Sequence, residues 1–196
     1  LSLAMINKDL SVKNEIATFN ASRGFILDAS EGILLLSIDN KLVLIENSSQ
    51  IIVLKLENSK NFFWHATRAE NKMFVQEYEE PPTRIFASED LKNWKKIAAN
   101  TDLDRHSKHF HYITYDPYRK WLIATLGDGC LTRVVYSEDF GETWKPLYRG
   151  PWQFVPVLVE ESRWILGFDS GIARSGVGVY ENGKLRFIFL KSRFSP

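Results

Sequence analysis

Three of the four histidines in the sequence stand close together, at His106, His109 and His111. Asp104 precedes them, and Asp128 follows in the next segment that is typical of a loop. Two imidazoles and a carboxylate can bind a divalent metal, and a histidine oriented by an aspartate suits general acid–base catalysis. His109 and His111 are two positions apart, so in a strand both side chains point to one side. The alternative is that one histidine caps the loop while another packs beside an aromatic ring. We expect the three histidines and Asp128 to contact a ligand, and we predict neither a bound metal nor a cofactor.

Three arginines form a second candidate site. Arg84 and Arg133 stand at the same place in two repeated segments, and Arg174 lies close to that place in the next one. Converging guanidinium groups would bind a carboxylate of a ligand in bidentate fashion. The alternative, which we favour, is that Arg84 and Arg133 form salt bridges with Glu79 or Asp128.

Aromatic residues occur near the same segments. Trp152 is our candidate ligand contact, and Trp64, Phe63 and Tyr112 are further aromatic residues of this kind. An indole ring can stack on the apolar C–H face of a pyranose, so these residues could bind a sugar. For each of them the alternative is packing between neighbouring structural repeats.

An internal repeat indicates which elements position these residues. The segment TRIFASEDLKNW at 83–94 is echoed by TRVVYSEDFGETW at 132–144, and each lies among four β-like runs separated by turn residues. A period of roughly 40 to 50 residues with several short strands is typical of propeller blades. A sandwich or a barrel of hairpins would explain the strand density but not the repeated phrase.

We therefore predict an all-β fold, a β-propeller of four-stranded antiparallel blades, with about four and a half blades in this chain. The expected ring is larger than the chain or is completed by a partner. The whole chain, 1–196, is then a single propeller region with these parts: a half blade at 1–19, blades at 20–57, 58–100, 101–150 and 151–190, and a tail at 191–196.

The second copy of the phrase contains a complete S-x-D-x-G-x-T-W motif, formed by Ser137, Asp139, Gly141, Thr143 and Trp144. The chain thus resembles the BNR/Asp-box (sialidase-like) β-propeller superfamily. The first copy resembles a degenerate box with Ser88, Asp90 and Trp94. The resemblance implies that each box lies between the third and fourth strands of a blade, away from the binding face. Since Asp and Ser can bond nearby amides and Gly permits positive φ, the box residues are expected to be structural.

The binding face should lie at the other end of the blades. Successive hairpin turns alternate between the two ends of an antiparallel sheet, so the box turns share one end. The opposite end then gathers the segments 58–65, 77–84, 102–111, 127–133, 149–154 and 168–175.

Composition excludes several other classes of protein. With 25 Lys+Arg against 24 Asp+Glu, the net charge of +1 gives no reason to expect nucleic acid as a partner. Cys130 is the only cysteine, which excludes an intrachain disulfide. The apolar runs are too short for a membrane-spanning helix, and we expect a soluble protein without a signal peptide in this segment, of unknown compartment. A Gly-rich phosphate loop between a strand and a helix is absent, which argues against a dehydrogenase or a kinase.

Two functions from different classes fit the sequence. The first is a propeller that binds, and in an enzymatic form processes, a glycan or other small polar ligand in a funnel opposite the boxes. An enzyme would be of the glycoside hydrolase or lyase type, although the sequence singles out no catalytic residue. A true sialidase is not expected, since there is no Phe/Tyr-Arg-Ile-Pro motif and no clear Tyr/Glu nucleophile pair. The second is a non-enzymatic interaction or assembly module, whose ring is completed by a protein partner or by a missing segment.

Overall fold

The computed structural model describes the chain except residues 7, 9–10, 31, 172–173 and 190–196. The described residues form one two-stranded and four four-stranded antiparallel sheets, and each sheet follows the chain order of its strands. The N-terminal hairpin consists of β1 (Ser2–Ile6) and β2 (Val12–Thr18). The all-β fold and the count of four and a half blades are therefore confirmed.

The four complete blades have the following strands. The first contains β3 (Gly24–Ser30), β4 (Ile33–Ile38), β5 (Lys41–Glu46) and β6 (Ser49–Lys55). The second contains β7 (Phe62–Ala69), β8 (Lys72–Tyr78), β9 (Arg84–Ser88) and β10 (Lys95–Ala99). The third contains β11 (Phe110–Asp116), β12 (Trp121–Leu126), β13 (Thr132–Ser137) and β14 (Lys145–Gly150). The fourth contains β15 (Phe154–Val159), β16 (Arg163–Phe168), β17 (Gly176–Glu181) and β18 (Lys184–Phe189).

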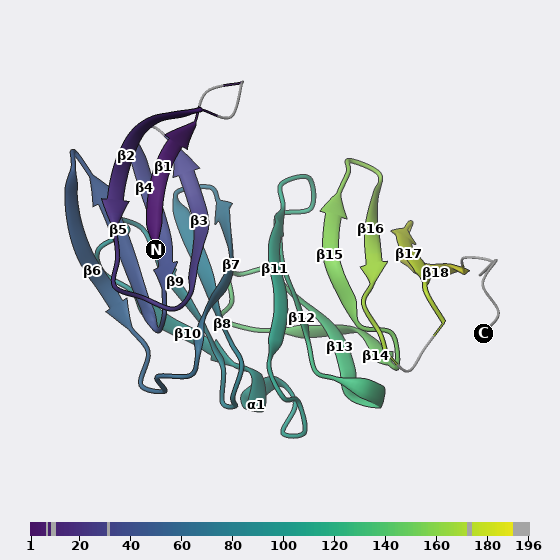
Figure 1. The fold of residues 1–196 in the computed structure, drawn as a ribbon. Coiled ribbons are helices and arrows are strands. Elements are labelled where there is room, and N and C mark those ends of the chain that lie inside the picture. The colour runs from purple at the N-terminus through teal and green to yellow at the C-terminus, as the bar shows by residue number, and fades with distance from the viewer. Residues whose placement is uncertain (7, 9–10, 31, 172–173, 190–196) are drawn as a thin grey trace, which may run out of the picture.

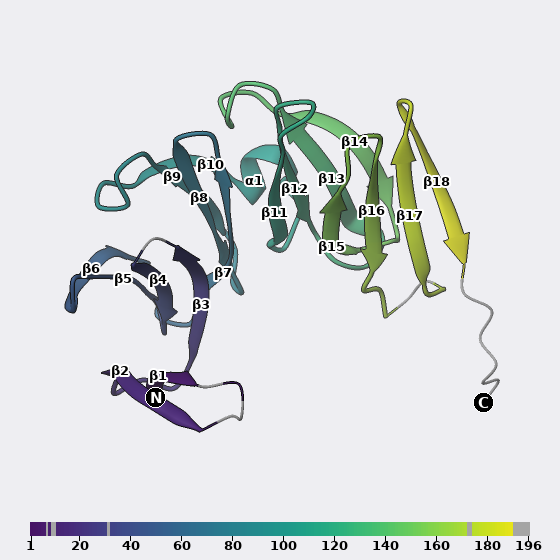
Figure 2. The ribbon, with the colours of Figure 1, turned by 90° about the horizontal axis from the view of Figure 1, so that it is seen from above.

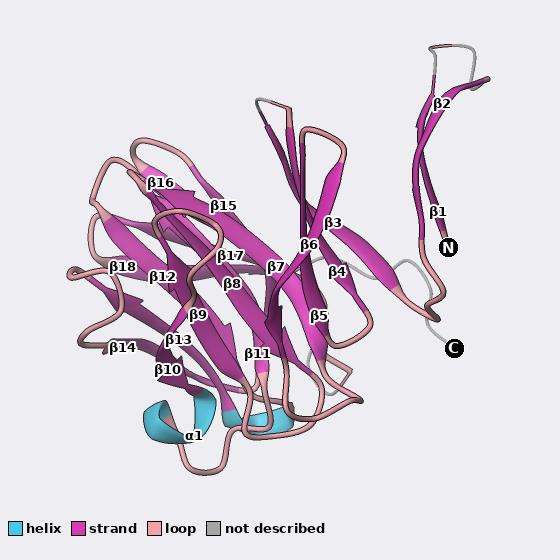
Figure 3. Cartoon of the chain, turned by 90° about the vertical axis from the view of Figure 1, so that its left-hand side faces the viewer, coloured by secondary structure: helices cyan, strands magenta, loops and turns pink. Residues whose placement is uncertain are grey.

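The blades stand side by side in an open arc (Figures 1 and 2). Their first strands are neighbours, since β3 contacts β7, β7 contacts β11, and β11 contacts β15. The helices of the described residues are short: α1 (Asn100–Leu103) and the 3-10 helix η1 (Gly129–Leu131). Figure 3 shows both helical segments at the same end of the blades. No helix among the described residues is long and apolar enough to cross a membrane.

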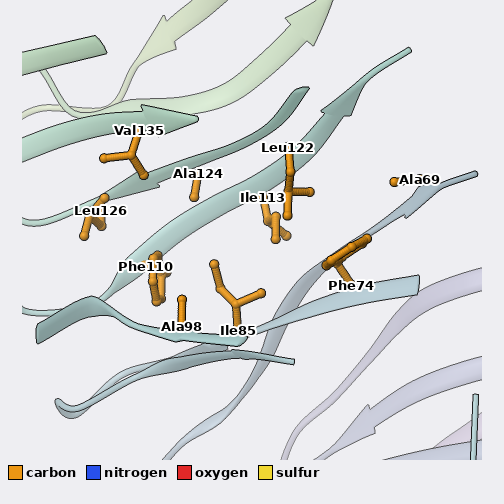
Figure 4. Packing of buried hydrophobic residues seen from close by; sticks show 10 residues of the cluster. All are labelled: Ala69, Phe74, Ile85, Ala98, Phe110, Ile113, Leu122, Ala124, Leu126 and Val135. Carbon is orange, nitrogen blue, oxygen red and sulfur yellow. The ribbon is translucent and has the colours of Figure 1, made fainter. Parts of the chain in front are cut away.

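The hydrophobic core consists of layers between successive blades. Strand β8 shows how the alternation of a strand builds two layers, because Phe74 packs toward the third blade while Met73 and Val75 pack toward the first. Figure 4 shows the layer between the second and third blades, where Ala98 and Ile85 lie near Phe110, and Phe74 lies on the side of Ile113. Burying one large apolar side chain of this kind stabilises the fold by roughly 1.5–3 kcal/mol.

A hydroxyl group of one blade also binds the first strand of the next blade. The Ser37 Oγ accepts a hydrogen bond from the backbone N–H of Phe63 (3.0 Å), and the Thr83 Oγ1 accepts one from that of Phe110 (3.2 Å). Immediately after each of these phenylalanines the pairing register shifts, as in a β-bulge. The bulges leave Trp64 in β7 and His111 in β11 at equivalent positions without a partner in the register. A bulge changes the direction of a side chain. The same local backbone irregularity therefore sets the direction of both Trp64 and His111.

The two box segments form the turns between β13 and β14 and between β9 and β10. In the first turn the Ser137 hydroxyl lies 2.7 Å from Asp139 Oδ1, which accepts the Thr143 N–H at 2.8 Å. The Trp144 Nε1–H donates to the Gly141 carbonyl (3.1 Å).

The second turn repeats this pattern without the glycine. The Ser88 hydroxyl lies 3.1 Å from Asp90 Oδ1, and that oxygen accepts the Asn93 N–H at 2.7 Å. The Trp94 Nε1–H donates to the Leu91 carbonyl, and Leu91 itself adopts a positive φ of 61°. The same hydrogen bonds therefore form around a left-handed residue that is not glycine.

Candidate functional site

Four elements meet at the end of the blades that carries α1: the end of β8, the start of β11, the end of β12 and the start of β15. Since strands alternate in direction, the two box turns lie at the opposite end. His109, His111 and Asp128 come together here, with their potential ligand atoms within 4.8 Å of one another. These are three of the eight candidate ligand-binding residues expected from the sequence.

His109 is almost fully buried, with 3% of its surface exposed, just before β11. Its Nδ1 lies 2.8 Å from the Glu79 carbonyl oxygen, and its ring lies 4.2 Å from the ring of Tyr78. A carbonyl can only accept, so Nδ1 carries the hydrogen. The other nitrogen, Nε2, has no hydrogen-bond partner among the described residues and faces Asp128 Oδ1 at 3.6 Å.

His111 is also buried, in the bulge of β11. Its Nε2 lies 3.0 Å from Asp128 Oδ1 and 3.1 Å from the Gly127 carbonyl oxygen, so Nε2 donates. Its Nδ1 lies 3.2 Å from the Gln153 Nε2 and accepts from that amide. Gln153 precedes β15, so the fourth blade contacts this imidazole of the third blade, while the Gly127 carbonyl makes Nε2 the donor.

Asp128 lies between the two imidazoles and is 39% exposed. The interactions with His109 and His111 hold the pKa of its carboxyl far below its usual range. Lys108 adds a positive charge, with its Nζ 3.6 Å from Asp128 Oδ2. The carboxylate is thus ionised at neutral pH and faces solvent on one side.

A glycine allows the chain to bring Asp128 back onto β11. Gly127 has a φ of +85°, and a Cβ at this position would lie 2.1 Å from the Leu131 carbonyl oxygen. Its N–H donates to the His109 carbonyl (2.9 Å). Any larger residue would clash with η1, so glycine is required for the carboxylate to reach both imidazoles.

An aromatic wall continues from the histidines toward the first blade. Trp64, which is 40% exposed, stacks on Tyr78 with ring centroids 5.2 Å apart and an interplanar angle of 28°. Phe25 of β3 and Phe62 of β7 pack against the same indole at 5.3 and 5.6 Å. These rings of the first two blades form one continuous surface, which we call the aromatic wall (Phe25, Phe62, Trp64 and Tyr78). The wall reaches the third blade where Tyr78 contacts His109. Burial, followed by the charges of Asp128, Glu79 and Asp169, raises the pKa of the Tyr78 hydroxyl.

The three candidate arginines have separate partners. Arg84 pairs with Glu57 (2.7 Å) and Glu77 (3.3 Å). Arg133 is buried and pairs with Asp104 at 2.5 Å. Arg174, in the segment between β16 and β17, lies with its guanidinium carbon 5.8 Å from the ring of Phe189. The acids beside Arg84 and Arg133 therefore differ from Glu79 and Asp128, the partners named in the sequence-based alternative.

Glu77 is a buried carboxylate that the sequence did not single out. It is fully buried and accepts a hydrogen bond from the Asn61 amide at 2.7 Å. Burial raises its pKa, although Asn61 and Arg84 act in the opposite direction. Asn61 also bonds the backbone of Glu80, so the group fastens the loop that follows β8.

The two remaining candidates, His106 and Trp152, are not part of the His109–His111–Asp128 cluster and have other partners. His106 is exposed, and its Nε2 accepts a hydrogen bond from the Arg105 Nε at 2.9 Å. Trp152 packs within the fourth blade, with its ring 4.4 Å from Phe187 and 5.9 Å from Phe168.

Tyr78 and Gln153 complete the site but were absent from the candidates. A repeat alignment offers a signal for Gln153. Phe63, Phe110 and Phe154 each precede a register shift in the first strand of their blade. The residue before each is Phe62, His109 or Gln153, so these three positions are equivalent. Tyr78 can be assigned to the site only from its pairing with Phe62 across β7 and β8.

No family model matches the sequence, and no curated protein matches it. Solved structures are nevertheless similar in fold. A chain of a nidogen/laminin complex is 10% identical with a TM-score of 0.62, over 94% of this chain and 72% of that one. An oligogalacturonate lyase in complex with manganese is 10% identical with a TM-score of 0.61, over 93% of this chain and 57% of that one.

TolB from Acinetobacter baumannii is 11% identical with a TM-score of 0.58, over 96% of this chain and 48% of that one. The chain thus spans about half the length of the lyase and of TolB. At these identities the similarity shows the fold alone, a β-propeller.

Proposed function

We propose that the chain is a ligand-binding propeller whose ligand is a carbohydrate, held at the end of the blades that carries His109, His111 and Asp128. The observation that carries this proposal is the exposed face of Trp64 in the aromatic wall, whose last ring, Tyr78, contacts His109 and His111 beside the ionised Asp128. A pyranose has an apolar C–H face and a rim of hydroxyls, and therefore needs an aromatic platform beside hydrogen-bonding groups.

The polar groups near the wall suit hydroxyl recognition. The Asp128 carboxylate accepts hydrogen bonds, and the Lys108 ammonium beside it donates them. Both side chains are more than one third exposed, so a ligand can reach them without a change in the fold. The oligogalacturonate lyase supports the proposal by analogy of fold, because it is a carbohydrate-acting protein with a similar propeller.

Binding to a glycan array, followed by titration calorimetry with the best glycan, tests the proposal. Trp64→Ala should weaken binding about tenfold, since ring stacking contributes roughly 0.5–1.5 kcal/mol beyond its buried area. Tyr118→Ala is the matched control, because Tyr118 is also exposed but lies in the β11–β12 turn at the opposite end. Absence of any glycan ligand, or equal affinities for the wild type and Trp64→Ala, would refute carbohydrate binding. Release of reducing ends or of unsaturated products from a bound glycan would identify the hydrolase or lyase form.

We also propose kinship with the BNR/Asp-box propellers. The support is the matching pattern of hydrogen bonds in the two turns, where Asp139 and Asp90 each accept backbone N–H groups. Hydrogen bonding within these turns lowers the pKa of both carboxyls, that of Asp139 to about 2. On this proposal the box residues hold the turn between the third and fourth strands and take no part in binding.

A protein-interaction module is the second candidate function, and the open side of the fourth blade favours it. Leu158 and Ile188 face away from the third blade and are 55% and 56% exposed. In the other blades the corresponding side is covered by the next sheet, so this face is suited to a further blade from another chain. Analytical ultracentrifugation tests self-assembly: a species larger than 22.7 kDa that Leu158→Lys dissociates would support it. A monomer at all concentrations would contradict completion by a second copy.

A further inference from the structure

The His109 Nε2 faces Asp128 Oδ1 at 3.6 Å, too far for a hydrogen bond, so this buried nitrogen has no hydrogen-bond partner among the described residues. Nδ1 of His109 carries the hydrogen, because it is bonded to the Glu79 carbonyl oxygen. In the neutral imidazole, Nε2 then presents a lone pair to Asp128 Oδ1 at 3.6 Å. Two acceptors that face each other repel, and a cation between them, either a proton on Nε2 or a metal ion, turns this repulsion into attraction.

The neighbouring groups complete a ligand set around that lone pair. The His111 Nε2 lies 3.0 Å from the same Asp128 oxygen, and the Gly127 carbonyl oxygen lies 3.1 Å from His111 Nε2. Two imidazole nitrogens with one carboxylate are ligands of first-row transition metals, whereas Mg²⁺ and Ca²⁺ prefer oxygen atoms throughout. Asp128 is exposed on one side, so an ion can enter from solvent.

We propose that His109, His111 and Asp128 bind one divalent transition-metal ion, of the class of Zn²⁺, Co²⁺ or Mn²⁺. The inference concerns the site of the proposed function, but it depends on the unpartnered His109 nitrogen and needs no sugar. Metal binding would deepen the proposed function, because an ion held here lies beside the aromatic wall and could coordinate ligand hydroxyls or carboxylates.

Binding requires small, specific changes at three residues. The ligand atoms span up to 4.8 Å, whereas two ligands of one ion lie at most about 4.2 Å apart at bond lengths near 2.1 Å. The exposed Asp128 side chain can close this gap. His111 must move its hydrogen to Nδ1, which a reversal of the Gln153 amide permits, since the amide oxygen then accepts from that nitrogen. Lys108 must turn into solvent, and it is already 53% exposed.

Metal binding alone, measured on the untagged 196-residue chain, tests the inference. Isothermal titration with Zn²⁺ and the visible absorption of the Co²⁺ complex should both give one equivalent. His109→Gln and Asp128→Asn should each weaken Zn²⁺ binding at least tenfold, while the control His106→Ala leaves it unchanged because His106 is exposed and bonded to Arg105. Lys108→Gln should strengthen binding severalfold, since it removes the competing positive charge.

The outcomes separate the two proposals. Absence of Zn²⁺ and Co²⁺ binding in the folded wild type overturns the metal site, and so does an equal loss in His106→Ala and His109→Gln. Because Asp128 is partly exposed, Asp128→Asn provides a variant that should remain folded, which circular dichroism checks. Glycan binding without metal binding would support the proposed function and refute the metal site. Metal binding without any glycan ligand would support the metal site and refute carbohydrate binding.

Discussion

The link between Asp116 and Trp164 should dominate the stability of the joint between the third and fourth blades. Trp164 is fully buried, and its Nε1–H donates to Asp116 Oδ2 at 2.6 Å across the two blades. Asp116 is also fully buried and accepts the backbone N–H groups of Tyr118 and Arg119 (2.9 and 3.0 Å). Asp116→Ala leaves the indole N–H buried without an acceptor and removes the ion pair with Arg119 at 2.8 Å. We expect a loss of about 3–5 kcal/mol in the free energy of unfolding.

A double-mutant cycle isolates the hydrogen bond between the blades. Trp164→Phe removes the donor, so Asp116→Ala should cost about 1.5–3 kcal/mol less in that background. Urea unfolding followed by far-ultraviolet circular dichroism measures the four variants without relying on the mutated tryptophan. Trp94→Phe, in the turn between β9 and β10 of the second blade, is the control and should be additive with Asp116→Ala within about 0.5 kcal/mol. A coupling below about 0.5 kcal/mol between Asp116 and Trp164 would refute the reasoning.

Two further predictions concern the buried carboxylate and the box turn. Burial raises the pKa of Glu77, so its contribution to stability is present at low pH and is lost as the pH rises through the folded-state value. Glu77→Gln keeps an oxygen that accepts from the Asn61 amide but cannot ionise. The fall in Tm between pH 4.5 and pH 7.5 should therefore be smaller in this variant than in the wild type, and an equal fall would contradict the prediction. Gly141 has a φ of +96°, and an added Cβ would lie 2.5 Å from the Ile97 Cδ1. Gly141→Ala should therefore lower the free energy of unfolding by about 1–3 kcal/mol. Gly183→Ala should cost less, because φ is also positive there but no atom lies within 4 Å of the added Cβ. Equal losses would show that the Ile97 side chain moves aside without cost.

The fold was predictable because its signals are local. Each blade is a meander of neighbouring strands, so short β-like runs and turn residues specify the pairing without long-range information. The repeated phrase at 83–94 and 132–144 supplied the period, and with it the direction of each strand. That alternation also placed His109, His111 and Asp128 at one end of the blades.

The side-chain partners of the residues at the His109–His111–Asp128 end of the blades were less predictable from the sequence. The sequence shows that Arg133 begins a strand, but the choice of Asp104 as its partner depends on the path of the chain through α1. Trp152 was the candidate ligand contact and Trp64 only a further aromatic residue of the same kind. In the structure Trp152 packs against Phe187 of the fourth blade, while Trp64, in the bulge of β7, is 40% exposed. Burial of an aromatic residue is set by packing between blades, which no local pattern specifies.

The bulges of β7 and β11 determine how the second and third blades present Trp64 and His111. A regular strand would alternate its side chains, so that residues 62 and 64, or 109 and 111, would line one face and leave the intervening phenylalanine on the other. The bulge keeps Phe63 and Phe110 in the layers between blades and at the same time frees the next residue from the pairing. The second blade places an indole at that position and the third places an imidazole. The same type of bulge, hydrogen-bonded to a hydroxyl of the preceding blade, thus positions both the Trp64 indole and the His111 imidazole. The proposed ligand requires both an apolar platform and a polar group of this kind.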